Sequence, residues 1–150
     1  MGSGQDTLSE EESSLELLYV NTCSAMPEGY QVVVQGSAEV PAFSELFYAQ
    51  VAVNDKVELR GMIDSGSMAC TLNEEAEHRL REAGSLLGEP QPAERIMLIG
   101  CGGKQTRPKC MYDLTLNIYG VKCIVPVLVV PGQRDKLIIG SNVLIHVMHL

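Results

Sequence analysis

A single carboxylate in a tight turn is the group in this sequence best suited to chemistry. Residues 59–63 have the pattern of a strand, and they deliver Asp64 into a turn formed by Ser65, Gly66 and Ser67. Two carboxylates that share a proton can take a proton from water and give one to a peptide carbonyl, because like charges about 3 Å apart do not both ionise. The sequence contains one Asp-Ser-Gly and no Asp-Thr-Gly. A carboxylate pair therefore requires a second copy of the chain.

A second segment, late in the chain, completes the pattern. Residues 137–144 have three apolar residues, then Gly140, then the start of a short helical pattern. The segments 59–72 and 137–144 resemble the paired motifs of retroviral-like (retropepsin-type) aspartic proteases, especially those of Ty3/gypsy-type retrotransposons and their domesticated relatives. The resemblance covers roughly residues 43–148. It implies a mostly β, retropepsin-like closed β-barrel with one helix after the active-site loop and a short C-terminal helix, assembled as a symmetric homodimer.

The resemblance also assigns roles around the turn. Asp64 is implied to be catalytic, and Ser65, Gly66 and Ser67 to support the active-site loop. Ser65 is implied to brace the carboxylate pair across the dimer. Ser67 stands where viral enzymes often carry Ala, and its hydroxyl is expected to hydrogen-bond the ionised carboxylate and lower its pKa. Beneath the active-site loop, the structural support is expected to come from Ile139 and Gly140.

A glycine-rich hairpin is expected between the two motifs. An apolar run at 95–99 enters a tip with three glycines within four residues, where positive φ is tolerated. Gly-x-Gly-Gly alone also fits an ordinary bulged hairpin, and no Gly-Lys-Ser/Thr follows to indicate a nucleotide loop. By resemblance this is the flap that closes over substrate, with the binding residues Ile99, Gly100, Cys101, Gly102 and Gly103. The apolar cleft residues are assigned more loosely, to Met68, Ile99 and Val129.

Alternating patterns predict the elements that position these residues. Residues 46–53 alternate in polarity, Asn54-Asp55 suits a two-residue hairpin turn, and 56–63 returns as the second strand. A helix follows, begun either by a capping box of Thr71 and Glu74 or by Asn73. Its apolar stripe consists of Ala76, Leu80 and Ala83, and Gly84 is expected to end the helix.

The later strands are also visible in the sequence. Residues 112–119 alternate, Gly120 turns the chain, and 121–130 form a long apolar strand in which Pro126 indicates an edge or a bulge. A final helix is expected after 137–139, capped by one of two residues, Ser141 or Asn142.

The distribution of charged and turn residues predicts three segments along the chain. The first 50 residues contain eight acids and no Lys or Arg, while the other eleven acids balance all eleven bases, so the net charge of −8 belongs to the N-terminal part. Residues 1–15 are expected to be a disordered acidic leader that includes a cloning remnant. Residues 16–42 are expected to be an N-terminal extension with short strands, such as 15–20 and 30–35. Residues 43–150 are expected to form the protease-like domain.

The composition of the chain limits which partners and which metal or cofactor sites are expected. The length of 150 residues suits one domain, and no apolar run approaches the roughly 18 residues of a membrane span. The acidic balance disfavours a nucleic-acid partner. Five cysteines without a Cys-x-x-Cys favour free thiols in a reducing compartment, and hence a cytoplasmic location. Their spacing to the three histidines fits no common zinc pattern, so no metal and no other cofactor is expected.

Two functions remain open from the sequence. The leading one is a homodimeric aspartic endopeptidase whose substrate is a polypeptide, either a retroelement polyprotein or an intracellular protein. The alternative is a catalytically weak or inactive module for dimerisation or for binding peptide as an added strand. Ser141 stands where viral enzymes often use Arg for an interchain ion pair, and the interface strand that ends viral enzymes is missing or replaced by residues 16–40. These departures favour the module, whereas the intact Asp64-Ser65-Gly66 favours the enzyme.

Overall fold

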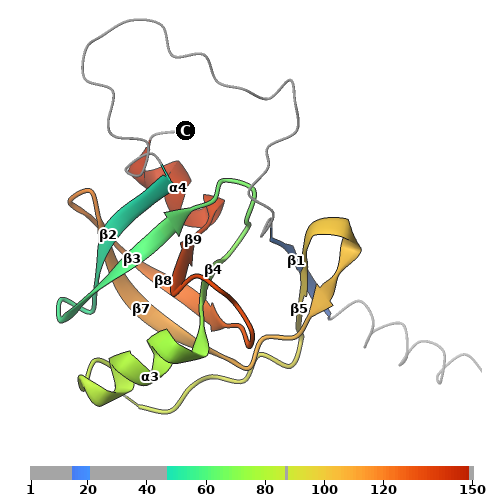
Figure 1. Cartoon of the computed structure of the whole chain (residues 1–150), viewed down its shortest axis with the longest axis horizontal. Coiled ribbons are helices and arrows are strands. Elements are labelled where there is room, and N and C mark those ends of the chain that lie inside the picture. The colour runs from blue at the N-terminus through green and yellow to red at the C-terminus, as the bar shows by residue number, and fades with distance from the viewer. Residues whose placement is uncertain (1–14, 21–46, 87, 149–150) are drawn as a thin grey trace, which may run out of the picture.

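A closed barrel of six strands lies at the centre of the structure, which confirms the predicted mostly β architecture (Figure 1). The computed structural model describes residues 15–20, 47–86 and 88–148. The predicted strand at 30–35 and most of the acidic leader lie outside these ranges. The strand order around the barrel is β2 (Tyr48–Val53), β3 (Val57–Ile63), β9 (Leu137–Ile139), β4 (Cys70–Leu72), β8 (Val121–Val129) and β7 (Cys110–Ile118), with β7 pairing back onto β2.

The β2–β3 hairpin forms as predicted and leads directly to Asp64. Its turn residues Asn54 and Asp55 both have positive φ, 51° and 55°, and Lys56 N–H donates to the Val53 carbonyl at 3.0 Å. Two successive positive φ values match the right-handed twist of the flanking strands. The Asn54 side chain also accepts from Thr115 N–H at 2.8 Å. The turn is thereby joined to the neighbouring strand β7.

Strand β9 separates the two strands that flank the Asp64 turn. It pairs in parallel with β3, with Ile63 opposite Ile139, and antiparallel with β4, with Thr71 opposite Ile138. The ends of β3 and β9 and the start of β4 therefore lie at the same edge of the barrel. The connection from β3 to β4, residues 64–69, must cross over the end of β9 at that edge.

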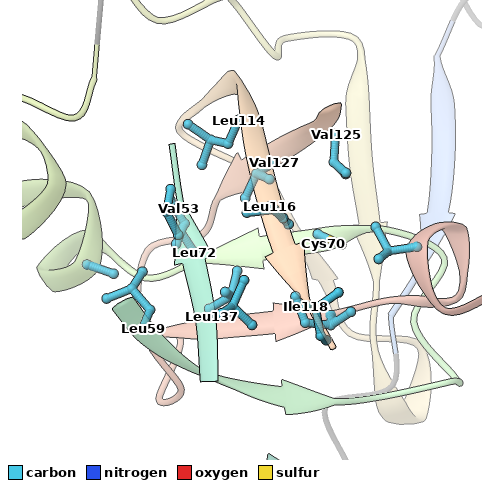
Figure 2. Packing of buried hydrophobic residues seen from close by; sticks show 14 of the residues in the cluster. Val53, Leu59, Cys70, Leu72, Leu114, Leu116, Ile118, Val125, Val127 and Leu137 are labelled. Carbon is cyan, nitrogen blue, oxygen red and sulfur yellow. The ribbon is translucent and has the colours of Figure 1, made fainter. Parts of the chain in front are cut away.

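The barrel interior is filled by aliphatic side chains from every strand (Figure 2). Alternate residues of β2 and β7 point inward, as the sequence predicted. All the residues labelled in Figure 2 are fully or almost fully buried: Val53, Leu59, Cys70, Leu72, Leu114, Leu116, Ile118, Val125, Val127 and Leu137. Pro126 is exposed, and it precedes the part of β8 that also pairs with β4. Its missing N–H therefore falls in the part of the strand paired only with β7.

Helix α3 (Glu74–Glu82) follows β4 and has the predicted extent. Asn73 is its N-cap, and the Asn73 side chain accepts from Ala76 N–H at 2.7 Å. The alternative capping box is wrong because Thr71 lies within β4. Ala83 ends the helix, and Gly84 follows with a φ of +69°.

Helix α4 (Ser141–Val147) begins one or two residues earlier than the two predicted caps imply. Gly140 is its N-cap, and no side chain caps the helix, so the expected cap by Ser141 or Asn142 is wrong. The backbone explains this, because Ser141 N–H donates instead to the Ser67 carbonyl at 2.6 Å. No helix within the described ranges is long and apolar enough to cross a membrane.

A second sheet of three strands stands beside the barrel (Figure 1). Its strands are β1 (Glu16–Tyr19), β5 (Ile96–Ile99) and β6 (Gln105–Thr106). The β5–β6 hairpin has Leu98 opposite Thr106, and its tip is a 3-10 turn, η1 (Cys101–Gly103). Gly102 and Gly103 have positive φ, so the tip needs glycine where the sequence has it. The predicted strand at 15–20 is present as β1.

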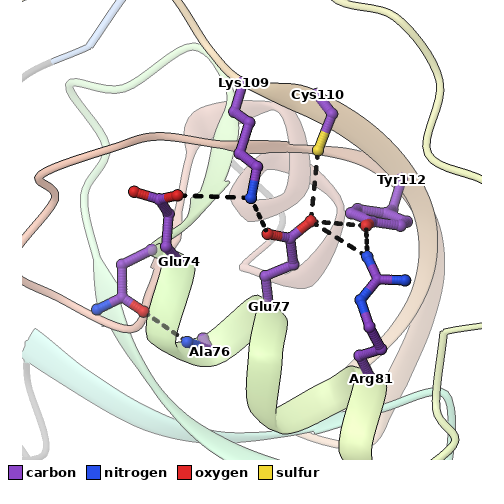
Figure 3. A network of polar contacts seen from close by, with 8 residues as sticks. Glu74, Ala76, Glu77, Arg81, Lys109, Cys110 and Tyr112 are labelled. Atoms are coloured by element: carbon purple, nitrogen blue, oxygen red, sulfur yellow. Dashed lines mark hydrogen bonds and ion pairs between the residues drawn. The ribbon is translucent and has the colours of Figure 1, made fainter.

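A buried carboxylate joins helix α3 to the barrel (Figure 3). Glu77 is 5% exposed, and it accepts from the Tyr112 hydroxyl at 2.6 Å and from Lys109 Nζ at 2.9 Å. Arg81, one turn along α3, donates to Tyr112. Burial acts to raise the pKa of Glu77, but the hydrogen bonds from Tyr112 and Lys109 outweigh it and hold this pKa below its ordinary value. Sequence patterns assigned no role to Glu77.

Replacement of Glu77 tests this connection. Glu77→Gln is expected to lower the free energy of unfolding at neutral pH by about 2 kcal/mol, because hydrogen bonds to a buried charge are worth more than neutral ones. The contribution of Glu77 is complete above its unfolded-state pKa, near 4.5, and disappears as the pH falls through the lower folded-state pKa. The difference between the variant and the wild type should therefore shrink in acid, as measured by urea unfolding at several pH values.

Glu75→Gln is the matched control on the same helix. Its carboxylate is 74% exposed and lies 3.9 Å from Lys136, so its loss should change stability little at any pH. Equal losses for the two variants would show that the buried network does not hold the helix.

Candidate active site

Asp64 is the first residue after β3, at the edge where the connection crosses β9. Its backbone N–H donates to the Ile139 carbonyl at 2.9 Å, and its own carbonyl accepts from Ser67 N–H at 3.1 Å. The first bond extends the β3–β9 pairing by one residue, and the second closes a tight turn. The carboxylate is therefore placed by the backbone at a fixed point on the barrel edge, where Asp64 is half-buried.

Two hydrogen bonds orient the carboxylate. Gly66 N–H donates to Oδ1 and the Ser67 hydroxyl donates to Oδ2, each at 3.0 Å. Ser67 is 1% exposed, whereas Ser65 and Gly66 face solvent. Burial raises the pKa of Asp64 above its ordinary value, and the bonds from Ser67 and Gly66 act in the opposite direction. None of these influences is a second carboxylate.

Gly140 lies directly beneath the Asp64 loop. A Cβ at this position would stand 2.7 Å from the Ser67 carbonyl oxygen and closer still to that of Ala69. Both atoms belong to the backbone, and the Ser67 carbonyl also accepts from Ser141 N–H. The loop therefore approaches β9 to a distance that only glycine permits.

Cys70 is a further contact at this crossing that the sequence did not reveal. Its sulfur accepts from Gly140 N–H at 3.4 Å and donates to the Asn142 side-chain oxygen at 3.5 Å. Burial raises the pKa of the thiol to about 11, so it stays protonated and can donate. A buried Cys at the start of a strand carries no local signal of this contact, because its partners are about 70 residues away in the sequence.

The glycine-rich hairpin reaches the Asp64 loop through a second apolar cluster. Ala69, at the end of the loop, and Leu98, in β5, share this cluster with Leu128. Ile99 ends β5, and Gly100 N–H donates to the Lys104 carbonyl at 2.7 Å, which closes the hairpin. The tip between them consists of the other three candidate residues, Cys101, Gly102 and Gly103. The contact of these five residues with substrate stays a prediction.

The loosely assigned cleft residues differ in position. Met68 is 48% exposed next to the Asp64 turn, and Ile99 is partly buried. Val129 is completely buried in the barrel core, so its assignment to a cleft is wrong. The alternation of β8 breaks down at Val127–Val129, where consecutive residues are all buried because β4 and β7 flank this part of the strand. Among the described residues, no group of three or more His, Cys, Asp or Glu is placed to hold a metal ion.

Comparisons with known proteins agree with this arrangement. Residues 49–143 match the family model described as aspartyl protease. Among solved structures, the EIAV protease complexed with the inhibitor HBY-793 is similar, with 20% identity, a TM-score of 0.54, and coverage of 67% of this chain and 86% of that chain. The retroviral protease-like domain of Ddi1 from Leishmania major has 18% identity, a TM-score of 0.47, and coverage of 67% and 75%. No match was found among curated protein sequences.

The likeness to the EIAV protease concerns the fold. At 20% identity it shows that the barrel, with β9 between the strands that flank Asp64, is of the retroviral-protease type. The expected retropepsin-like fold is thereby confirmed for the single chain.

Gly140→Ala tests the crossing. Alanine is expected to lower the free energy of unfolding by about 3 kcal/mol or more, because the obstructing atoms are the backbone carbonyls of Ser67 and Ala69. The Ser67 carbonyl cannot move away without losing its bond from Ser141 N–H. Gly132→Ala is the control, since its Cβ would meet nothing within 4 Å and its cost is only that of a positive φ, about 1 kcal/mol. Urea unfolding gives both values, and similar costs would contradict the crossing.

Ser67→Ala tests the electrostatics of the carboxylate. Loss of the hydroxyl removes a bond that favours the ionised form, so the pKa of Asp64 should rise further above its ordinary value. NMR titration of the Asp64 carboxyl measures this without any assay of activity. Glu75→Gln, on the exposed face of α3, should leave the titration unchanged, and a pKa that does not move in Ser67→Ala would refute the assignment.

Proposed function

This chain belongs to the aspartyl protease family, and we propose that it is an endopeptidase that acts as a symmetric homodimer with one catalytic Asp64 from each copy. The observation that carries the proposal is the half-buried Asp64 carboxylate, held by Ser67 and Gly66 on a loop that Gly140 locks to the barrel. A purely structural turn has no need of a half-buried carboxylate whose pKa is raised by burial.

The proposed mechanism uses two Asp64 carboxyl groups at a two-fold axis. Close to one another, they share one proton, because two like charges in contact do not both ionise. The ionised group takes a proton from water, the oxygen of which attacks the peptide carbonyl, while the protonated group donates to the carbonyl oxygen. Collapse of the tetrahedral intermediate breaks the C–N bond and returns a proton to the leaving amine. Neither a metal nor a covalent intermediate is required.

Features of the sequence and of the surface support the proposed self-association. The sequence supplies only one Asp-Ser-Gly per chain. Ser65 is exposed beside Asp64, where it is available to brace the partner's loop as proposed. Helix α4, which begins directly below that loop, leaves Ile145 48% exposed and Met148 50% exposed. Two exposed apolar side chains at the same end of one helix fit a surface that becomes covered in the proposed dimer.

The proposed substrate is a polypeptide in extended form, either the polyprotein of a retroelement or an intracellular protein. The β5–β6 hairpin is proposed as the flap, with Ile99 and the tip residues contacting the bound peptide. The backbone groups along the strands of this hairpin suit recognition of a peptide as an added strand. Specificity would then come from side chains at alternate positions of that peptide.

Cleavage of a mixed peptide library between about pH 4 and pH 7 tests the function. The wild type should cut peptides with a specific activity that rises with protein concentration, because only the dimer contains a carboxylate pair. Asp64→Asn should lose this activity while keeping the same midpoint of thermal unfolding.

Failure of the wild type to cleave at any concentration would contradict the proposal. Sedimentation of the same sample then identifies the reason. A dimer without activity would indicate a peptide-binding or dimerisation module, whereas a monomer would indicate that the carboxylate pair never forms.

A further inference from the structure

Strand β1 is attached to the proposed flap by its backbone. It runs parallel to β5, with Glu16 opposite Ile96 and Tyr19 opposite Ile99, and Figure 1 shows the two strands side by side, outside the barrel. Glu16 N–H donates to the Arg95 carbonyl at 2.7 Å, and Val20 N–H donates to the Ile99 carbonyl at 2.8 Å. Residues 15–20 therefore lie on β5 as an added strand.

The same segment is bonded to the active-site loop on its other side. Met68 N–H donates to the Tyr19 carbonyl at 2.8 Å, and Met68 follows Asp64 by four residues. The backbone of residues 15–20 thus bridges the β5–β6 hairpin and the loop that carries the candidate catalytic carboxylate. A polypeptide substrate held between the flap and that loop would need the same backbone groups.

The side chains of the segment alternate between an apolar cluster and solvent. Leu18 and Val20 pack against the cluster of Ala69, Leu98 and Leu128, whereas Leu17 is 46% exposed and Tyr19 is 56% exposed. Main-chain bonds to a sheet edge, together with alternate side chains in apolar pockets, are the means by which proteins bind extended peptides. The segment therefore has the features of a bound ligand.

We propose that residues 15–20 occupy the peptide-binding site of the chain itself and compete with substrate within the same molecule. This inference rests on the proposed function and adds its regulation. It also gives the class of peptide that the site accepts, an extended segment with aliphatic residues two positions apart. An external peptide binds only to the fraction of molecules from which the segment has left, so its apparent affinity is reduced by that fraction.

Displacement of the segment should therefore strengthen peptide binding. The probe is a fluorescently labelled hexapeptide, Leu-Glu-Leu-Leu-Tyr-Val, which copies residues 15–20. Its binding is measured by anisotropy in the full chain carrying Asp64→Asn, so that nothing is cleaved. Addition of Leu18→Asp should tighten Kd about tenfold, because a charge in the apolar cluster expels the segment. Leu17→Asp adds the same charge on the exposed face and should leave Kd unchanged.

A second pair of variants avoids the apolar cluster altogether. Glu16→Pro removes the N–H that donates to the Arg95 carbonyl, whereas Glu16→Ala keeps it, and the Glu16 side chain is exposed in either case. Glu16→Pro should tighten peptide binding relative to Glu16→Ala, and it decides the question if Leu18→Asp does not fold. If neither variant exceeds its control, or if both bind peptide more weakly, β1 is a permanent structural strand and the proposal is overturned.

The outcome is separable from that of the proposed function. Tighter binding in Leu18→Asp, with no cleavage either by the wild type or by Leu18→Asp that retains Asp64, would support the competing segment and reject the enzyme. Cleavage by the wild type with equal Kd values in Leu18→Asp and Leu17→Asp would support the enzyme and reject the competing segment.

Discussion

The close crossing of the Asp64 loop over Gly140 is the constraint on which the rest of the site depends. Strand β9 lies between β3 and β4, so the chain that joins β3 to β4 has to pass over the end of β9. The approach is so close that a backbone bond from Ser141 to the Ser67 carbonyl replaces any side-chain cap of α4. Because backbone atoms meet backbone atoms, the position of the carboxylate is fixed by the barrel and hardly depends on flexible side chains.

Opposing effects act on the carboxylate at this point. Burial favours its neutral form, while the Ser67 hydroxyl and Gly66 N–H favour the ionised form. In the proposed dimer, two Asp64 carboxyl groups in contact would share one proton because their like charges repel. This repulsion would add to the burial that already raises the pKa of Asp64 in the single chain.

Helix α3 and strand β1 are attached to the rest of the structure by different kinds of contact. Helix α3 is fastened by the buried Glu77 and its donors Tyr112 and Lys109, an arrangement that resists local opening. Strand β1 is attached mainly by backbone bonds at a sheet edge, with two of its apolar side chains largely in solvent. Elements with few buried contacts open at the lowest free energy. This difference is in line with the proposed exchange of the strand beside the active-site loop.

The sequence alone determined the features that depend on local patterns: the hairpin turn at Asn54-Asp55, the alternation of β7, the helix α3, the glycine-rich tip, and the place of Asp64 after a strand. It also determined that one chain supplies one Asp-Ser-Gly. Which distant groups meet depends on the packing of the folded chain, which no local pattern reveals. Gly140 rather than Ser141 is the N-cap of α4 because Ser141 N–H donates to the Ser67 carbonyl, and Val129 is buried because a second strand covers it. The position of residues 15–20 between β5 and Met68 was likewise invisible, since strand pairing across some 80 residues leaves no periodic trace in either segment.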